Sequence, residues 1–343
     1  MKFDDVITIK DIAKALNLST STVSRALRGR YEISAETKKM VLEYAERMNY
    51  RPNLIALSLK EQRSKAIGIV VSEIANNFFS QAINGIESIA YNRGYHVIIT
   101  QSHESRDREM VNVQHLVSRN VDGLLLSFSC ETTDMAYFQQ LHEKGFPMVQ
   151  FDRVMADLDT HKVIADNYQG AFHATEHLIS QGFRKIGHIT STNNLNITRE
   201  RLQGYKDALL KHHIPYDEEL VKHCNRGGMI YEEVEEAVES LFFNKSKIDA
   251  LFTAGDRLTT VCLSALKNVQ NKYKQVGFIG FTNTNLADLF TPSVSVVRQP
   301  AFEIGQRATE LLIEMIESKK PITDFEQEVL SSHLIIRDSS KPL

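Results

Sequence analysis

The feature that most constrains the fold is a regular alternation, from Ala66 onward, of short apolar, β-branched runs with longer helical patterns. Such runs are typical of strands buried on both faces, and the helices between them indicate right-handed βαβ units. The predicted strands form two series, 67–71, 96–100, 123–128 and 147–152, then 162–166, 185–190, 250–254 and 276–281. Two series predict two doubly wound lobes, each with a parallel sheet.

This architecture predicts where a ligand would bind. Open parallel sheets bind ligands beyond the carboxyl ends of their strands, and two facing lobes place those ends around one cleft. The sequence contains neither a G-x-G-x-x-G motif nor a phosphate-binding loop, which argues against dinucleotide binding and nucleotide hydrolysis. We therefore expect a small-molecule site between the lobes.

The first 65 residues differ in charge from the rest of the chain. They hold 13 Lys and Arg against 8 Asp and Glu, whereas the remaining 278 residues carry a net charge of −8. A basic head on an acidic body favours a polyanionic partner for the head.

Two short helices joined by a tight turn are predicted in the head. Thr8 can cap the first helix in a box with Asp11. Asn17 tolerates the left-handed backbone of a turn, and Ser19 can cap a second helix over 20–27. Apolar residues recur at helical spacing in both, namely Ile9, Ile12, Ala13, Leu16, Val23, Ala26 and Leu27.

A third helix is expected from the cap Ser34 through about Met48, with Val41, Leu42, Ala45 and Met48 completing a small core. The outward face of the second helix is polar and basic, and consists of Thr20, Ser21, Ser24, Arg25 and Arg28. This pattern describes a helix-turn-helix whose recognition helix enters the major groove of DNA. The Arg25 guanidinium suits guanine N7 and O6. A generic three-helix bundle with its polar helix facing water remains an open alternative.

The segment after the third helix predicts a DNA-dependent hinge. Pro52 interrupts the helical pattern, and residues 53–60 form an apolar-rich helical stretch too short to be stable alone. Apolar side chains can wedge between base steps in the minor groove. We expect this stretch to fold on DNA when two copies come together.

These motifs make a family resemblance specific. The runs 8–13, 19–27 and 50–53, in this order and spacing, resemble the headpiece of the LacI/GalR family. The resemblance implies that Thr20, Ser21 and Arg25 read bases and that Leu59 inserts at the operator centre. Leu57 departs from the Arg that many members have in the hinge. The full set of implied DNA-binding residues is Thr8, Ser19, Thr20, Ser21, Thr22, Ser24, Arg25, Arg28, Ser34, Asn53, Ala56 and Leu59.

The body resembles the periplasmic-binding-protein-like sensor of the same family. The resemblance implies effector contacts at Phe78, Phe79, Asp152, Arg153, Arg201, Met229, Gly255, Asp256, Thr282 and Gln299. Arg201 is the strongest single candidate because its planar fork suits bidentate pairing, although it could instead tie loop carbonyls together. Phe78 and Phe79 could stack on a sugar or pack in the core. Gly255 and Thr282 replace the Asn and Asp that anchor sugar hydroxyls in many members.

No metal or cofactor is expected. His173 and His177 fit an H-x-x-E-H zinc pattern, but they lie in a helix of a βα repeat and match a family run, so we interpret the match as coincidence. Cys130, Cys224 and Cys262 form no C-x-x-C pair and are expected to be buried thiols.

The predicted protein is an all-α helix-turn-helix headpiece (1–52), a hinge and linker (53–65) and an α/β sensor of two lobes (66–343). Lobe one is expected over 66–161 and 293–320, and lobe two over 162–292 and 321–343. We predict a cytoplasmic homodimer, or a dimer of two such dimers, that represses transcription from operator DNA. A small-molecule effector, a sugar or sugar derivative, is expected to control this repression.

Two other classes of protein share part of this pattern. A solute-binding protein of sugar uptake would share the body, but it needs an export signal and has no use for residues 1–60. An α/β enzyme would need a catalytic constellation, and the sequence offers no Ser/His/Asp motif, phosphate loop or metal set. No apolar run is long enough to span a membrane.

Overall fold

The computed structural model of the 343-residue chain describes residues 7–27, 33–50, 63–243, 248–270 and 276–342. The chain divides into two compact units, residues 1–64 and residues 65–343. We describe each unit by itself.

The first unit contains three helices, α1 (Ile9–Ala15), α2 (Thr20–Leu27) and α3 (Ala35–Arg47). The predicted capping box is present, because the Thr8 amide donates to Asp11 Oδ2 at 2.9 Å and the Asp11 amide to Thr8 Oγ1 at 3.4 Å. Asn17 adopts φ = +53° in the turn. Ser19 Oγ accepts a 3.0 Å bond from the Thr22 amide. The predicted helix-turn-helix is confirmed.

The core of this unit is small. It is built from side chains of all three helices, namely Ile12, Ala13, Val23, Ala26, Val41 and Ala45. The prediction that Leu42 and Met48 belong to it is wrong, because they are 43% and 39% exposed. Leu42 lies about 100° around the helix from the buried Val41, and Met48 is the C-cap residue, where the helix ends.

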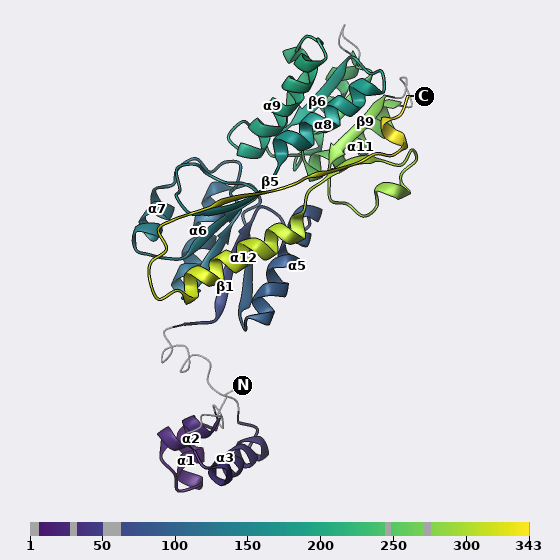
Figure 1. The fold of residues 1–343 in the computed structure, drawn as a ribbon. Helices are drawn as coiled ribbons and strands as arrows, with labels where there is room; N and C mark the ends of the chain where they lie inside the picture. Colours follow the sequence, from purple (N-terminus) through teal and green to yellow (C-terminus); the bar gives the residue numbers. More distant parts are fainter. Residues whose placement is uncertain (1–6, 28–32, 51–62, 244–247, 271–275, 343) are drawn as a thin grey trace. The chain divides into compact units, whose positions relative to one another are not determined.

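The second unit contains two six-stranded sheets (Figure 1). The first sheet has the order β11-β5-β4-β3-β1-β2 and is parallel throughout. The second has the order β12-β10-β9-β8-β6-β7, and only β12 is antiparallel to its neighbour. Strands of the first sheet are β1 (Ala66–Val71), β2 (His96–Gln101), β3 (Gly123–Leu126), β4 (Met148–Phe151), β5 (His161–Ala165) and β11 (Gln327–Leu330). Those of the second are β6 (Ile186–Thr190), β7 (Val221–His223), β8 (Ala250–Thr253), β9 (Gly277–Phe281), β10 (Ser295–Arg298) and β12 (His333–Ile335).

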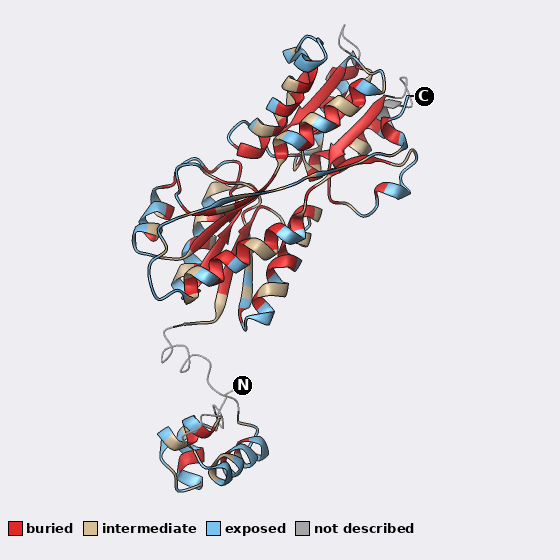
Figure 2. Cartoon of the chain, viewed as in Figure 1, coloured by how far each residue is buried: buried red, intermediate tan, exposed pale blue. Residues whose placement is uncertain are grey.

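Helices cover both faces of each sheet, so the inner strands are almost completely buried, whereas the strands nearer the edges, β2, β7, β11 and β12, are partly exposed (Figure 2). In lobe one, α5 (Asn77–Asn92) and α12 (Ala301–Glu317) cover one face, and α6 (Arg106–Ser118) and α7 (Ala136–Glu143) the other. In lobe two, α8 (Asn167–Ser180) and α9 (Asn196–Lys211) lie opposite α10 (Tyr231–Phe243) and α11 (Asp256–Gln270). Three 3₁₀ helices complete the unit: η1 (Glu218–Leu220), η2 (Ala287–Leu289) and η3 (Asp338–Ser340). The prediction of two doubly wound lobes is confirmed.

Two helices of lobe one approach each other closely through glycine. A Cβ at Gly305 of α12 would overlap the carbonyl of Ala82 on α5, and one at Gly85 would overlap the carbonyl of Phe302. Glycine at both positions lets the two backbones meet, as the side-by-side course of α5 and α12 in Figure 1 shows.

The predicted division of residues between the lobes needs correction. Strand β5, placed in lobe two, pairs with β4 in the sheet of lobe one, and β11 joins the same sheet. Strand β10, placed in lobe one, pairs with β9 in lobe two. The chain crosses between the lobes three times, after β5, after β10 and after β11. The expected boundaries missed this, because a strand that ends at a crossing has the same apolar pattern in either lobe.

Candidate functional site

Helix α2 presents a polar surface in the first unit. Thr20, Ser21 and Arg25 are exposed, Thr22 and Ser24 are half-buried, and Val23 and Ala26 face the core. The Ser19 hydroxyl lies 2.7 Å from that of Ser21 and 2.8 Å from that of Thr22. The first turn of α2 therefore carries a group of hydroxyls beside the positive end of the helix dipole, an arrangement that suits phosphate oxygens.

The other predicted DNA-binding residues are of two kinds. Thr8 and Ser34 cap α1 and α3 through their hydroxyls. Arg28, Asn53, Ala56 and Leu59 lie outside the described residues.

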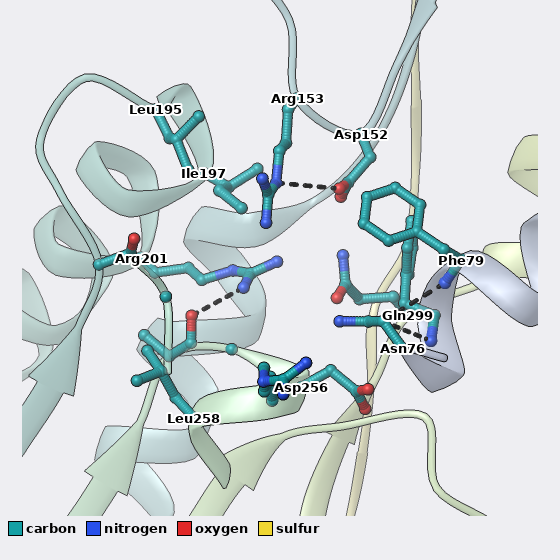
Figure 3. A pocket seen from close by; sticks show the side chains of 16 residues that line it. Asn76, Phe79, Asp152, Arg153, Leu195, Ile197, Arg201, Asp256, Leu258 and Gln299 are labelled. Carbon is teal, nitrogen blue, oxygen red and sulfur yellow. Dashed lines mark hydrogen bonds and ion pairs between the residues drawn. The ribbon is translucent and has the colours of Figure 1, made fainter. Parts of the chain in front are cut away.

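A pocket of about 480 Å³, which includes space open to solvent, lies between the two lobes (Figure 3). Its walls come from the carboxyl ends of strands in both sheets, as predicted. Asp152 follows β4, Ser191 follows β6, Ala254 follows β8 and Gln299 follows β10. Eight of the ten predicted effector residues line it: Phe78, Phe79, Asp152, Arg153, Arg201, Gly255, Asp256 and Gln299.

Arg201 is buried at the inner side of the pocket. Its Nε and Nη2 donate to Asn167 Oδ1 at 2.9 and 2.7 Å, and its Nη1 donates to the Ala254 carbonyl at 2.9 Å. These bonds use three of the five guanidinium N–H groups, which leaves two for a ligand. Burial lowers the pKa of Arg201 to about 10, against the attraction of Asp152 and Glu200. Arg201 therefore ties a loop carbonyl, as the alternative held, and still has capacity to bind.

Aromatic rings in the core of lobe two pack against the Arg201 guanidinium. Its guanidinium lies 4.0 Å from the ring centroid of Phe281. Phe281 contacts Phe252 at 6.0 Å, and His188 stacks between Phe252 and Tyr205 at 4.8 Å from each. The cation is thus fixed on a column of rings that runs through the core of lobe two.

A second arginine lies between two carboxylates. Arg153 Nη1 donates to both oxygens of Glu104, at 2.6 and 2.8 Å, while its Nε lies 3.9 Å from Asp152 Oδ2. Burial disfavours the Arg153 cation, but Glu104 and Asp152 outweigh that penalty and raise its pKa. Burial also raises the pKa of Asp152, which Arg153 and Arg201 oppose.

Two buried donors in the pocket have no hydrogen-bond partner within the described part of the chain. They are Arg153 Nε and Gln299 Nε2, on residues whose side chains point into the pocket in Figure 3. Neither atom makes a hydrogen bond to a described residue, although the Gln299 amide is near enough to Asp152 to lower the pKa of that carboxyl. An unpaired buried N–H group costs about 1–3 kcal/mol. Both groups therefore favour a ligand that supplies acceptor oxygens.

Apolar side chains form the rest of the wall. Phe78 and Phe79 are 4% and 1% exposed and belong to the core of lobe one as well as to the pocket, so both readings of this pair hold in part. Leu195, Ile197 and Leu258 add aliphatic surface from lobe two.

Asp256 joins the two lobes. Its Oδ2 accepts bonds from the Asn77 amide at 2.9 Å and from Asn77 Nδ2 at 3.2 Å, on α5 of lobe one. Its Oδ1 accepts from Thr282 Oγ1 at 2.5 Å and from the Asn283 amide at 2.8 Å. Four protein donors thus surround this carboxylate, although the residue borders the pocket.

Two predicted effector residues are not brought to the pocket. The Thr282 hydroxyl donates to Asp256, but Thr282 does not line the pocket. Met229 lies in the loop after β7 and does not line it either. Eight lining residues were not predicted: Asn76, Ser191, Leu195, Ile197, Gly227, Ala254, Arg257 and Leu258. Ser191 directly follows the predicted strand 185–190 and Ala254 ends the predicted strand 250–254, so both could have been found by looking at the carboxyl ends of strands. The others lie on loops or in the first turns of helices, whose course the sequence pattern does not reveal.

The H-x-x-E-H motif is engaged in other contacts. His177 Nε2 lies 2.9 Å from Ser340 Oγ, and Glu176 pairs with Lys211 at 2.7 Å and with His212 at 3.1 Å. His173 is exposed. Among the described residues, no three His, Cys, Asp or Glu side chains form a group that could hold a metal ion. Nor does any described helix combine the length and apolar character that crossing a bilayer requires.

A helix-turn-helix unit and a two-lobed body with a polar pocket define a class of protein, the ligand-responsive regulators of transcription. Residues 8–53 match the model of bacterial regulatory proteins of the lacI family, and residues 64–337 match that of periplasmic binding proteins and the sugar-binding domain of the LacI family. The chain belongs to the LacI family. A bacterial DNA-binding regulator acts in the cytoplasm, where the chromosome lies, so the predicted location follows from the family.

Individual relatives are similar to this chain over nearly its whole length. A ribose operon repressor from Halalkalibacterium halodurans is 29% identical over 97% of this chain and 97% of its own. Among solved structures, a complex of the transcriptional regulator CelR with cellobiose is 27% identical, with a TM-score of 0.70 over 97% of this chain and 99% of its own. The operator-bound lac repressor dimer with the anti-inducer ONPF shares the fold, with a TM-score of 0.82 at 20% identity over 98% and 100%.

Membership of the LacI family excludes the two alternative classes, a solute-binding protein and an enzyme. The headpiece match excludes a solute-binding protein of uptake, and the match of both units to regulatory proteins excludes an enzyme. The chain is a DNA-binding transcriptional regulator with an effector-binding domain.

Proposed function

We propose that this protein is a repressor whose α2 binds operator DNA and whose affinity for that DNA is set by an uncharged, polyhydroxylated small molecule, a sugar or sugar derivative. The observation that carries the effector assignment is the pair of unpaired buried donors, Arg153 Nε and Gln299 Nε2, close to the Asp152 carboxylate. A sugar hydroxyl accepts and donates at once, so it can satisfy donors and carboxylate together.

The charges around the pocket support an uncharged effector. Arg153 is balanced by Glu104, and Arg257 is paired with Glu73. Arg201 faces the nearby Asp152 and Glu200. No cation is left in excess among these residues, so the pocket offers little to an anionic group. The apolar rings of Phe78 and Phe79 suit the C–H face of a sugar. The named specificity of the ribose operon repressor and the cellobiose bound to CelR support the same class.

For DNA, α2 is the reading helix. Its exposed Thr20, Ser21 and Arg25 offer two hydroxyls and one guanidinium to a major groove. Residues 1–52, 53–65 and 66–343 serve as headpiece, linker and sensor, a division supported by the boundary between Ser64 and Lys65.

The active species is a homodimer, which matches an operator with two half-sites. Exposed apolar side chains support a second copy as partner. On lobe two, Leu286 and Leu289 are 57% and 77% exposed. On lobe one, Tyr91 of α5 is 74% exposed, and Ile98 of the edge strand β2 is 37% exposed. Unpaired edge strands with apolar residues are normally covered.

Effector binding alters the contacts between lobes. Three sets of contacts cross from lobe two to lobe one. Asp256 accepts from Asn77 of α5, Gln81 of α5 exchanges bonds with Asn283 at 2.9 and 2.8 Å, and Arg257 pairs with Glu73 in the loop before α5. A ligand that changes their geometry changes the position of α5. A coupling of about 1–3 kcal/mol would change operator affinity about 5- to 150-fold.

A direct experiment uses the purified full-length protein and the promoter region beside its own gene. DNA binding is measured by fluorescence anisotropy with D-ribose, D-glucose, D-galactose, D-fructose and cellobiose, each added separately. We expect specific binding to this duplex and a shift of at least fivefold with one sugar. Absence of any preference over random DNA would refute the repressor assignment. Operator binding that no sugar alters, together with no thermal shift by any sugar, would refute the effector class.

A further inference from the structure

Glu104 does not line the pocket, yet it controls the side chain that does. The residue is 3% exposed and follows β2 in a loop whose backbone continues to pair with the end of β1, through Ser102 to Val71 at 2.9 Å and His103 to Ser72 at 2.8 Å. Its own conformation is unusual, because His103 and Glu104 are two successive non-glycine residues with φ of +50° and +60°. This backbone directs the Glu104 side chain into the protein interior, where it contacts Arg153 of the pocket wall.

The Glu104 carboxylate is fully engaged there. Both of its oxygens accept hydrogen bonds from Arg153 Nη1, and Oε2 also accepts a hydrogen bond from the Cys130 amide at 2.9 Å. The strength of this contact is reflected in the pKa of Glu104, which burial would raise but which Arg153 holds below its ordinary value. The Arg153 guanidinium is also packed against the ring of Phe79, at 5.7 Å.

Glu104 and Asp152 compete for one guanidinium. Because Glu104 holds Nη1, the Nε edge of Arg153 stops 3.9 Å from Asp152 Oδ2, too far for a direct hydrogen bond. Nε has no partner among the described residues. A hydroxyl oxygen placed about 2.8 Å from both atoms would accept from Nε and donate to the carboxylate. Without Glu104, Arg153 would turn to Asp152 and close this gap.

We propose that Glu104 is a positioning residue for effector recognition, which holds Arg153 away from Asp152 so that the pair reads a single hydroxyl of the bound molecule. This inference rests on the proposed function of the pocket. Asp152 contributes to the same geometry, since its own φ of +58° fixes its side chain opposite the Arg153 Nε edge. Figure 3 shows Asp152 and Arg153 at the same side of the pocket, joined by their ion-pair contact.

The decisive variant is Glu104→Gln. It preserves the shape of the side chain and an acceptor for the Cys130 amide, but it removes the charge that holds Arg153. Affinity is measured by calorimetry for the five sugars named above and for their monodeoxy analogues. We expect the best-bound sugar to lose at least tenfold in affinity, and one monodeoxy analogue, discriminated by the wild type, to bind the variant nearly as well as its parent. The control Asp107→Asn removes an exposed charge three residues away and should bind as the wild type does.

A second readout needs no sugar. The Nε–Hε resonance of Arg153 in ¹⁵N-labelled full-length protein, assigned with Arg153→Lys, should shift in Glu104→Gln and exchange faster with water, by about tenfold. Arg153→Lys itself keeps a cation for Glu104 but lacks the Nε edge, so it should lose the same hydroxyl discrimination even if Glu104→Gln folds poorly.

The outcomes separate the two proposals. Unchanged affinity and an unchanged Arg153 resonance in Glu104→Gln, or wild-type discrimination by Arg153→Lys, would overturn the role of Glu104. If no sugar of the panel binds the wild type, the effector class fails, while the resonance still decides whether Glu104 positions Arg153.

Discussion

His188 should make the stability of this protein depend steeply on pH. The residue is fully buried in β6, stacked between Tyr205 and Phe252. Burial lowers its pKa to about 3, with a smaller contribution from His223. An unfolded histidine titrates near 6.5, so the unfolded chain binds a proton between these values and the folded chain does not. Stability contributed by neutral His188 is therefore lost as the pH falls below about 6.5.

The size of the effect follows from linkage. One proton bound only by the unfolded state changes the free energy of unfolding by about 1.4 kcal/mol per pH unit. Between pH 6.5 and 4.5 the loss from His188 amounts to about 2 kcal/mol, because the unfolded histidine is only half protonated at the upper limit. The variant His188→Phe keeps an aromatic ring in the stack and removes the titration. It should therefore unfold with a shallower pH dependence than the wild type over this range.

The measurement is urea unfolding of the full-length protein, followed by circular dichroism at pH 7.5, 6.5, 5.5 and 4.5. Other groups titrate in both proteins, so the difference between the two curves isolates His188. His173→Gln, which removes an exposed histidine from α8, should follow the wild-type curve. Parallel curves for His188→Phe and the wild type would show that the buried ring does not resist protonation, and the reasoning would be wrong.

Four further substitutions test other parts of the molecule. Arg25→Ala should weaken specific operator binding by about 1–3 kcal/mol, and unchanged discrimination between operator and random DNA in an anisotropy titration would exclude base reading. Arg201→Ala should abolish the sugar response and, by leaving Asn167 and the Ala254 carbonyl unpaired, lower stability by about 1–3 kcal/mol in urea unfolding. Asp256→Asn places an amide NH₂ against the N–H donors that surround the native carboxylate, so we expect a lower melting temperature. An unaltered melting temperature would contradict the role of Asp256 in joining the lobes. Gly305→Ala should force α12 from α5 and cost about 1–3 kcal/mol, which calorimetry would reveal.

Much of the fold could be predicted because the relevant signals are local. Helix α2 has the predicted bounds, since Ser19 caps it and Asn17 permits the turn before it. The predicted strands coincide with observed ones because burial on both faces produces unbroken apolar runs. Four short strands were not predicted. In β7, β11 and β12 exposed or half-buried residues interrupt that pattern, and β10 has only four residues although three of them are buried.

The site could be predicted only in part, for a different reason. Residues that directly follow strands, such as Asp152 and Gln299, lie where parallel sheets place them. Glu104 escapes such reasoning, because its position depends on two successive residues with positive φ. The saturation of Asp256 by donors from both lobes likewise depends on how the lobes meet, which no local pattern specifies.

The three crossings between the lobes place the pocket at the fulcrum of the body. Gln299 lies on one crossing and Asn167, which holds Arg201, lies on another. Lys65 enters lobe one at the opposite end of β1, about 20 Å away at about 3.3 Å per residue. Under the proposed function, a bound molecule that changes the angle between the lobes would displace the far end of the sheet more than the end beside the pocket. A small change of angle at the pocket would therefore become a larger displacement at the start of β1, where the chain leads toward its DNA-binding head.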